Sequence, residues 1–539
     1  MSALPKAERR WLLVVSLVLL LLTLLPLATA AAVTPPGHVF GGFVYEARDG
    51  DSYVAKTMEG VEGHFVYHDP YTSERQPPSF ILTPYLLIGQ LDRVLGLPVP
   101  LLLHLVSLVL AASLLAAVYL LVAEVFADAG RRRLAFLLTV LGGGLGFLAI
   151  GHAEILGYHY VSLDIAVSGS TGIDSMNLAP HILLASLGST WAAILWVRHR
   201  RHPTTARALG GLAWILLIST AYPQLAAMWA VVGVVAWAFR PSRSSLVMAA
   251  TWIAGAIPYV FYGLYLKATD PVFANWPPTG DVDVGDPLSY LVWGHILMLP
   301  VAAAAGVALW RRRRQPVAGD DALGLMAAWL GVCALLMYLP WLPAIMHRLF
   351  YASFIPFGIL AAAGLWRWAG LARTSRLRRR ILVYGTAAIC LAAVETVAQG
   401  FTIPLQHRDD LALYFPADEA AVLTRLRELE PGGGAVVMNS YNSGLFVPAI
   451  SGQTTYIGFP FETLNLTRKQ LNAVTFYRTA DAADLRSQAA ALSLDYVLWG
   501  VYERGLGGRD PGPVAGWKAV ASAGEARLYR VAPGVPAAR

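Results

Sequence analysis

Charged residues are scarce in this chain of 539 residues: Asp, Glu, Lys and Arg make up 14% of it, against about 25% in an ordinary soluble domain. Cysteine is almost absent, with two in the whole chain, and this excludes a disulfide framework. We also find no internal repeat and no low-complexity tract. Hydrophobic residues, in contrast, make up 56%. Most of the chain therefore cannot face water, and the composition predicts a polytopic membrane protein.

Apolar segments recur along the chain up to about residue 402. A helix needs about 20 apolar residues to cross a bilayer core of about 30 Å. About eleven segments are predicted to be transmembrane helices: 12–33, 99–126, 134–151, 177–197, 208–221, 223–239, 245–266, 289–310, 323–339, 347–369 and 381–402. The pair at 208–239 is short and is either two spans or one re-entrant pair. The apolar stretch 81–97 is interrupted by Pro84 and Asp92, which predicts a helix at the membrane interface.

Arginine and lysine gather in alternate loops. One set of loops holds most of the basic residues before residue 403: Lys6, Arg9, Arg10, Arg131–Arg133, Arg198, Arg200, Arg201, Arg207, Arg240, Arg243, Arg311–Arg314, Arg373, Arg376 and Arg378–Arg380. The positive-inside rule then predicts a multi-pass protein of the plasma membrane with a cytoplasmic amino terminus. The first apolar segment is long enough to be an uncleaved anchor rather than a signal peptide. Because topology explains the net charge of +7, we expect no nucleic-acid partner.

The composition changes to that of a soluble domain near residue 403. We expect a transmembrane domain over 1–402, with a long first extracytoplasmic loop over 34–98, and an extracytoplasmic domain over 403–539, called the tail. The tail contains predicted helices at 416–430 and 480–492 and predicted strands at 435–439, 454–457, 496–500, 517–522 and 526–531. Alternating helices and strands indicate an α/β domain with a partly parallel sheet. The predicted fold class is mainly α, with this α/β tail.

The long first loop, the 34–98 segment, is acidic. Two carboxylates stand just after the first predicted span in Asp49-Gly50-Asp51-Ser52-Tyr53. A structural interpretation is that Asp51 or Ser52 is the N-cap of a helix that begins there. A functional interpretation is a carboxylate that accepts a proton from an attacking hydroxyl or binds a metal ion. The two interpretations are compatible.

A second polar stretch, from Tyr67 to Pro78, leads into the predicted interfacial helix. Four ionisable side chains lie in it: His68, Asp69, Glu74 and Arg75. It is either a loop that handles an acceptor or a lipid phosphate, or an ordinary proline-rich turn. His64 and His68 are four residues apart, but without a third ligand this pair does not predict a metal site.

These motifs resemble those of the GT-C glycosyltransferases, multi-span enzymes that use polyprenyl-phosphate-linked sugars. The branch of the protein O-mannosyltransferases and the lipid A aminoarabinose transferase carries an acidic pair and a tyrosine after the first span, then a Lys-Pro-Pro element. Asp49 to Tyr53 match the first motif, and Gln76-Pro77-Pro78 matches the second. The chain departs from the family where Gly50 replaces the second acid and Gln76 replaces the lysine. Further along, Arg348 with Tyr351 and Pro356 is similar to an Arg-Tyr…Pro element of the family.

The resemblance implies a mechanism. Asp51 or Asp49 takes a proton from the acceptor hydroxyl, which attacks the anomeric carbon with inversion while the polyprenyl phosphate departs. Arg348 either holds the lipid phosphate or is a snorkelling interfacial arginine. An alternative to the arginine is a divalent cation, Mg²⁺ or Mn²⁺, on Asp49 and Asp51 with Glu154 or Asp164. The other candidate substrate-binding residues are Tyr53, His68, Asp69, Glu74, Arg75 and His181, the last of which is otherwise a packing histidine.

Two other functions suit a multi-span protein with a tail. A transporter of lipid-linked saccharides needs ionisable groups deep in several spans and an inverted repeat, and we find neither pattern. A non-enzymatic scaffold or sensor that displays the tail would not need the acidic 34–98 segment. We therefore expect an enzyme in the lipid bilayer that moves a sugar from a polyprenyl-phosphate-linked donor to a hydroxyl of a glycan, lipid or protein acceptor.

Overall fold

The computed structural model describes residues 4–144, 171–177, 179–274, 294–312, 315, 317, 319–337 and 348–531. The chain divides into two compact units. Unit 1 consists of Met1–Leu25, Leu105–Tyr265 and Pro278–Gln399, and unit 2 of Pro26–His104, Leu266–Pro277 and Gly400–Arg539. The last boundary between the two units lies between Gln399 and Gly400. The 34–98 segment, which we expected in the transmembrane domain, packs with the tail in unit 2.

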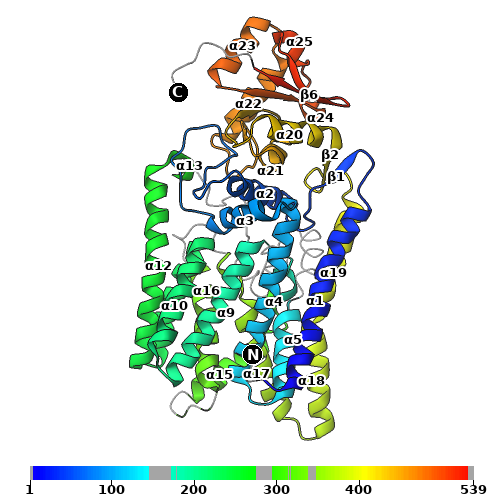
Figure 1. The fold of residues 1–539 in the computed structure, drawn as a ribbon. Helices are drawn as coiled ribbons and strands as arrows, with labels where there is room; N and C mark the ends of the chain where they lie inside the picture. The colour runs from blue at the N-terminus through cyan, green and yellow to red at the C-terminus, as the bar shows by residue number, and fades with distance from the viewer. Residues whose placement is uncertain are drawn as a thin grey trace, which may run out of the picture. The chain divides into compact units, whose positions relative to one another are not determined.

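Helices make up the described part of unit 1, and each of the eleven apolar segments overlaps at least one of them (Figure 1). They are α1 (Lys6–Ala32), α4 (Val99–Val125), α5 (Ala129–Leu141), α9 (Pro180–Arg201), α10 (Thr205–Ala221), α11 (Pro223–Phe239), α12 (Arg243–Thr269), α15 (Leu299–Arg311), α16 (Asp320–Met337), α17 (Phe354–Gly370) and the consecutive α18 (Ser375–Ile389) and α19 (Leu391–Gln406). Five described stretches are long and apolar enough to cross a membrane: α1, α4, α9, α12 and Ser375–Gln406. The number of eleven spans stays a prediction.

The short predicted pair at 208–239 forms two separate helices, α10 and α11, which meet at Tyr222. Pro223 has no N–H to donate, so it stops α10 and suits the first turn of α11. Each helix has 17 residues, fewer than the 20 or so that an untilted span requires. Their shortness was expected from the sequence.

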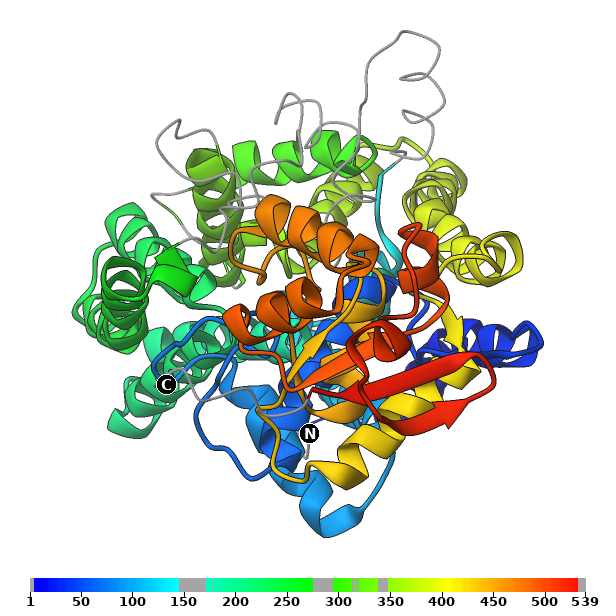
Figure 2. The ribbon, with the colours of Figure 1, turned by 90° about the horizontal axis from the view of Figure 1, so that it is seen from above.

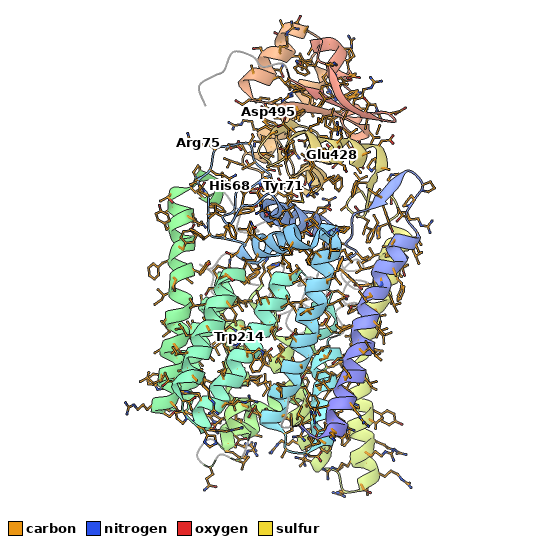
Figure 3. All side chains as sticks on the ribbon, in the orientation of Figure 1. His68, Tyr71, Arg75, Trp214, Glu428 and Asp495 are labelled. Carbon is orange, nitrogen blue, oxygen red and sulfur yellow. The ribbon has the colours of Figure 1, made fainter. Side chains whose placement is uncertain are left out.

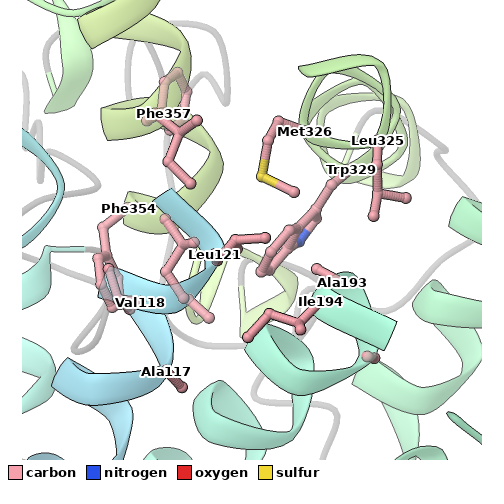
Figure 4. Close-up of a cluster of buried hydrophobic side chains, with 14 of the residues drawn as sticks. Ala117, Val118, Leu121, Ala193, Ile194, Leu325, Met326, Trp329, Phe354 and Phe357 are labelled. Carbon is pink, nitrogen blue, oxygen red and sulfur yellow. The ribbon is translucent and has the colours of Figure 1, made fainter. Parts of the chain in front are cut away.

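Aromatic side chains fill the core of unit 1. The Trp229 ring lies 4.5 Å from the Trp329 ring and 5.0 Å from the Trp252 ring, measured between centroids. The indole N–H of Trp229 donates to the Ser189 hydroxyl at 2.8 Å, which satisfies its polar atom inside the core. Figure 4 shows Trp329 of α16 among apolar side chains of α9, including Ile194. This packing holds α9, α11, α12 and α16 together.

Some of the basic residues that indicate topology also form ion pairs within unit 1. Arg132 of α5 binds Glu8 of α1 at 2.7 Å. Glu124, near the end of α4, accepts from Arg198 at 2.7 Å and from Arg201 at 2.6 Å. These arginines therefore form ion pairs between neighbouring helices, in addition to any effect on how the chain is oriented in the membrane.

Two helices of the 34–98 segment cross at a pair of glycines. They are α2 (Ala47–Val61) and α3 (Thr83–Leu95), and α3 lies within the stretch 81–97 predicted as a helix. A Cβ at Gly89 of α3 would lie 2.2 Å from the Thr57 carbonyl oxygen and 2.6 Å from the Gly60 Cα. No side chain fits there, so glycine allows the two backbones to touch.

We expect Gly89→Ala to destabilise the protein by about 1–3 kcal/mol, because a methyl group would force α2 and α3 apart. The matched control is Gly306→Ala in α15, where a Cβ would meet nothing within 4 Å. That control should be neutral or stabilise by up to about 1 kcal/mol, since alanine is the better helix former. Thermal unfolding of both variants in detergent measures the difference. Equal stability of the two variants would contradict the close crossing.

The tail contains a five-stranded sheet in the order β4-β3-β5-β7-β6 (Figure 2). Its strands are β3 (Val436–Met438), β4 (Thr454–Thr455), β5 (Tyr496–Trp499), β6 (Ala519–Ala523) and β7 (Ala526–Arg530). Strands β4, β3 and β5 are parallel, while β7 and β6 form an antiparallel hairpin at one edge. The main helices are α20 (Ala417–Leu429), α21 (Phe446–Ser451), α22 (Leu466–Arg478) and α23 (Ala482–Ala491). The predicted strands and the predicted helices at 416–430 and 480–492 are present; α21 and α22 were not predicted.

A short antiparallel pair joins the 34–98 segment to the start of the tail. Strand β1 (His38–Phe40) pairs with β2 (Tyr414–Pro416). Next to it, the Gly41 N–H donates to the Leu413 carbonyl at 2.8 Å. These bonds help explain why the 34–98 segment and the tail form one compact unit.

Candidate functional site

Helix α2 presents the acidic motif, and it begins earlier than the sequence suggested. Its first residue is Ala47, preceded by Glu46 in a left-handed conformation with φ 48°. Asp51 and Ser52 therefore lie inside the helix, and the interpretation of either as its N-cap is wrong. The Ser52 hydroxyl instead donates to the Asp49 carbonyl at 2.8 Å. Without a capping role, the burial of Asp51 needs another explanation.

The carboxylate of Asp51 is buried. Asp51 is 3% exposed, and its Oδ2 has no hydrogen-bond partner among the described residues. Burial raises the pKa of Asp51 well above its usual value, and the charge of Asp410 raises it further. A Cβ at Gly41 would lie 3.5 Å from Asp51 Oδ1, so glycine leaves room beside the carboxylate. Buried carboxyls with perturbed pKa values concentrate at functional sites.

Asp49 and Tyr53 lie on the same helix in different surroundings. Asp49 is half-buried. The Tyr53 ring stacks on Tyr85 of α3, with centroids 5.3 Å apart and planes at 9°. Burial and then the charges of Asp51 and other carboxylates, including Asp49, raise the pKa of Tyr71. The two aspartates and Tyr71 therefore share one electrostatic environment.

A buried ion pair connects α2 to the tail. Lys56 Nζ lies 2.6 Å from Glu462 Oε1, and both side chains are 6% exposed. Lys56 also donates to the Ser52 hydroxyl at 3.0 Å, while the Tyr67 hydroxyl donates to Glu462 Oε2 at 3.1 Å. The position of α2, and with it that of Asp51, therefore depends on a residue of the tail.

The polar stretch from Tyr67 to Pro78 is fixed by its own side chains and by the tail. Asp69 is buried and accepts from the Tyr71 N–H at 2.8 Å; burial and then the charge of Glu462 raise its pKa. Glu74 lies 2.6 Å from Lys469 Nζ of α22. Figure 3 shows His68 and Tyr71 on this stretch and Arg75 further along it, where Arg75 is exposed. The stretch is thus more than a proline-rich turn.

The two departures from the family motifs have structural reasons. A Cβ at Gly50 would lie 2.3 Å from Cγ of Phe43, so an acidic side chain does not fit where the family has its second acid. Gln76, which replaces the lysine, accepts from the Asp69 N–H at 2.9 Å and donates to the Asp69 carbonyl at 2.8 Å. The amide closes the loop on Asp69, which a lysine could not do with both donor and acceptor.

Three side chains of types that bind metal ions, Glu59, His64 and His68, lie together at the end of α2. Glu59 Oε2 is 3.0 Å from His64 Nδ1 and 3.6 Å from His68 Nδ1. The hydrogen bond to Glu59 raises the pKa of His64. Glu59 thus joins the two histidines in a group whose ligand atoms all lie within 4.8 Å of one another. Of the other predicted metal ligands, Glu154 and Asp164 lie outside the described residues.

Unit 1 brings His181 and Arg348 together around one tyrosine. The Tyr222 ring stacks on His181, with centroids 5.7 Å apart and planes at 12°. The Arg348 guanidinium donates to the Tyr222 hydroxyl at 3.2 Å, and Tyr351 packs edge-on against the same ring at 5.3 Å. Tyr222, which lies between α10 and α11, was not singled out from the sequence as a site residue, so its place at the centre of this cluster was missed.

A further pair of carboxyl groups lies buried in the tail. Glu503 accepts from the Ser440 N–H at 2.7 Å and from the Gly500 N–H at 2.9 Å, and Glu419 accepts from the Val501 N–H at 2.7 Å. Burial and then the charge of Glu503 raise the pKa of Glu419 to about 8. Three of the four carboxylate oxygens of this pair thus accept hydrogen bonds from backbone N–H groups that follow β3 and β5. The pair therefore stabilises the loops after these strands.

Comparison with known proteins gives matches in structure alone. The chain matches no protein-family model and no curated protein by sequence. The oligosaccharyltransferase of Archaeoglobus fulgidus matches with a TM-score of 0.54 and 13% identity, over 95% of this chain and 73% of that one. Arabinofuranosyltransferase AftD of mycobacteria matches with a TM-score of 0.54 and 15% identity, over 98% of this chain and 40% of that one. ArnT of Cupriavidus metallidurans matches with a TM-score of 0.50 and 11% identity, over 98% of this chain and 99% of that one.

The chain has the GT-C fold. The resemblance drawn from the short motifs is thereby confirmed at the level of fold. The GT-C fold and the apolar helices also support a location in the membrane. Other structures of these neighbours hold carrier lipids: the oligosaccharyltransferase with an inhibitory peptide and a dolichol-phosphate, and ArnT with undecaprenyl phosphate.

Proposed function

We propose that this GT-C chain is a glycosyltransferase of the plasma membrane. It moves a sugar from a polyprenyl-phosphate-linked donor to a hydroxyl of a glycan, lipid or protein acceptor on the extracytoplasmic face. The single observation that carries the proposal is Asp51, a buried carboxyl with an unpartnered oxygen on the helix after the first apolar segment. The carrier lipids held by structural neighbours support the class of donor.

In the proposed reaction Asp51 is the general base. It takes the proton of the acceptor hydroxyl, whose oxygen forms a bond to the anomeric carbon while the bond to the phosphate oxygen breaks, with inversion. The raised pKa of Asp51 makes it a stronger base than an ordinary carboxylate. The charge of the half-buried Asp49 then contributes to the electrostatic field around Asp51. Tyr53, which stacks on Tyr85, keeps α2 in place against α3.

The departing polyprenyl phosphate gains negative charge, which a cation must stabilise. We assign this role to Arg348, because a guanidinium stays charged and matches phosphate oxygens. Its bond to Tyr222, which stacks on His181, fixes the direction of the guanidinium. On the 34–98 segment, exposed Arg75 is the candidate for contact with substrate, while Asp69 and Glu74 position the loop that bears it.

The test measures release of free polyprenyl phosphate by the purified full chain in lipid, with a panel of polyprenyl-phosphate sugars and an envelope extract that supplies acceptors. We expect release with one donor. A variant of exposed Glu428, Glu428→Gln, is the control and should keep full activity, since Glu428 is 57% exposed. If every donor binds and none is turned over, the enzyme proposal fails and a scaffold that recognises lipid-linked sugars is favoured.

A further inference from the structure

We propose that Glu59, His64 and His68 form a binding site for one Zn²⁺ ion. The three residues come from the last turn of α2 and the loop that follows it. One ligand atom from each residue can be chosen so that all three lie within 4.8 Å of one another. The site is separate from the carboxylates of the proposed reaction and does not depend on the proposed function.

The spacing of the ligand atoms fits a metal ion. In a tetrahedral zinc site with bonds of 2.0–2.1 Å, neighbouring ligand atoms lie about 3.3 Å apart. Glu59 Oε2 is 3.0 Å from His64 Nδ1 and 3.6 Å from His68 Nδ1, so these pairs bracket that spacing. Two imidazole nitrogens and one carboxylate oxygen favour zinc over Mg²⁺ or Ca²⁺, which prefer oxygen ligands.

An unsatisfied nitrogen supports the proposal independently. His68 Nδ1 is shielded from solvent and has no hydrogen-bond partner among the described residues. Its 3.6 Å separation from Glu59 is too long for a hydrogen bond. A buried polar atom without a partner costs free energy, and a metal bond to this nitrogen would remove that cost.

The backbone holds the ligands in place without the metal. The His64 N–H donates to the Glu59 carbonyl at 3.0 Å, and the chain reverses at Gly63 with φ 101°. From α3, the Gln90 amide donates to the His64 carbonyl at 3.0 Å. The histidine side chains are 37% and 40% exposed, so a water molecule can reach the fourth position of the metal.

The distance along α2 assigns the ion a structural role. Glu59 follows Asp51 by eight residues, which is a rise of about 12 Å in an α-helix. A zinc ion bound to Glu59 is therefore too far along the helix for Asp51 to be one of its ligands. It ties the end of α2 to the loop that carries Asp69 and Tyr71. An effect of EDTA on sugar transfer would then not show that Asp49 or Asp51 binds a metal.

The experiment uses the tag-free full chain in detergent, stripped with EDTA, dialysed and titrated with zinc chloride in a calorimeter. Cobalt provides a second readout, because tetrahedral Co²⁺ has a strong visible absorption. The variants are Glu59→Gln, His64→Ala and His68→Ala. The control is His407→Ala, an exposed histidine of the same unit outside the cluster. Circular dichroism of the metal-free variants checks that all of them fold.

We expect one equivalent of zinc on the wild type and the control, and binding weaker by about tenfold or more in each cluster variant. The cobalt absorption should appear in the wild type and disappear in the cluster variants. Unchanged zinc binding in His64→Ala and His68→Ala would overturn the site, as would the absence of zinc binding to the wild type. Both readouts are independent of sugar transfer, so failure of the zinc site and failure of the enzyme proposal are distinguishable.

Discussion

Asp51→Asn should lower kcat for sugar transfer by about 10²- to 10⁴-fold, because the amide has the same shape and cannot accept the proton. The same substitution should leave the thermal midpoint unchanged or raise it, since it removes a buried charge whose Oδ2 has no partner among the described residues. Steady-state kinetics and thermal unfolding of one preparation measure both effects. Wild-type turnover in this variant would remove Asp51 from the mechanism.

Asp49→Asn is the matched control, since both aspartates lie on α2 and the sequence left open which of them is the base. A large loss in Asp49→Asn with a small one in Asp51→Asn would reverse the assignment. The pH dependence adds a second check. The pKa of Asp51 is raised by burial and by Asp410, so activity should decline as pH falls through a value well above the usual aspartate pKa. The residual activity of Asp51→Asn should not show this decline at low pH, because the variant lacks the titrating carboxyl.

Glu462→Gln should destabilise the protein by about 3–5 kcal/mol, because it leaves the Lys56 ammonium buried without its counter-charge. The loss should extend to function, since Lys56 and the Ser52 hydroxyl that it binds lie on the helix that carries Asp51. Thermal or denaturant unfolding in detergent measures the stability, and the donor-release assay measures the function.

The exposed pair of Arg425 and Glu428 is the control for the buried one. Glu428→Gln should cost less than about 1 kcal/mol, as exposed ion pairs do. The double variant Lys56→Met with Glu462→Leu should recover most of the lost stability, since neither charge then remains buried. If Glu462→Gln is as mild as Glu428→Gln, the contact between α2 and the tail does not carry the stability that we assign to it.

Much of the helical architecture could be predicted from the sequence, because a run of apolar residues has one stable solution in a bilayer. Strands β3 and β5 of the tail could also be predicted, since they are short apolar runs bounded by glycine or polar residues. Helix α22 was missed. Its buried face includes the charged Lys469, which pairs with Glu74, beside the apolar Ala473 and Phe476, so the face does not stand out as apolar in the sequence.

The site was predictable only where it depends on local motifs. Asp51 stands in a short motif, and the structure finds it buried. The residues that surround it come from distant parts of the chain: Tyr67 and Glu462, for example, are 395 residues apart. No pattern in a single sequence relates such positions. The N-cap interpretation failed for a different reason, because α2 begins at Ala47 after a residue with positive φ, which the sequence does not signal.

The pairing of β1 with β2 and of Lys56 with Glu462 has a consequence for biosynthesis. Tyr67 also contacts Glu462, and at about 5–20 residues per second the 395 residues between these two correspond to roughly 20 to 80 s of translation. During that time the 34–98 segment has emerged, while the strand and the carboxylate that complete it have not yet been made. The nascent chain must keep Lys56 hydrated and β1 unpaired until the tail arrives. A ribosome stalled before residue 414 would therefore leave the segment as a target for proteases and chaperones.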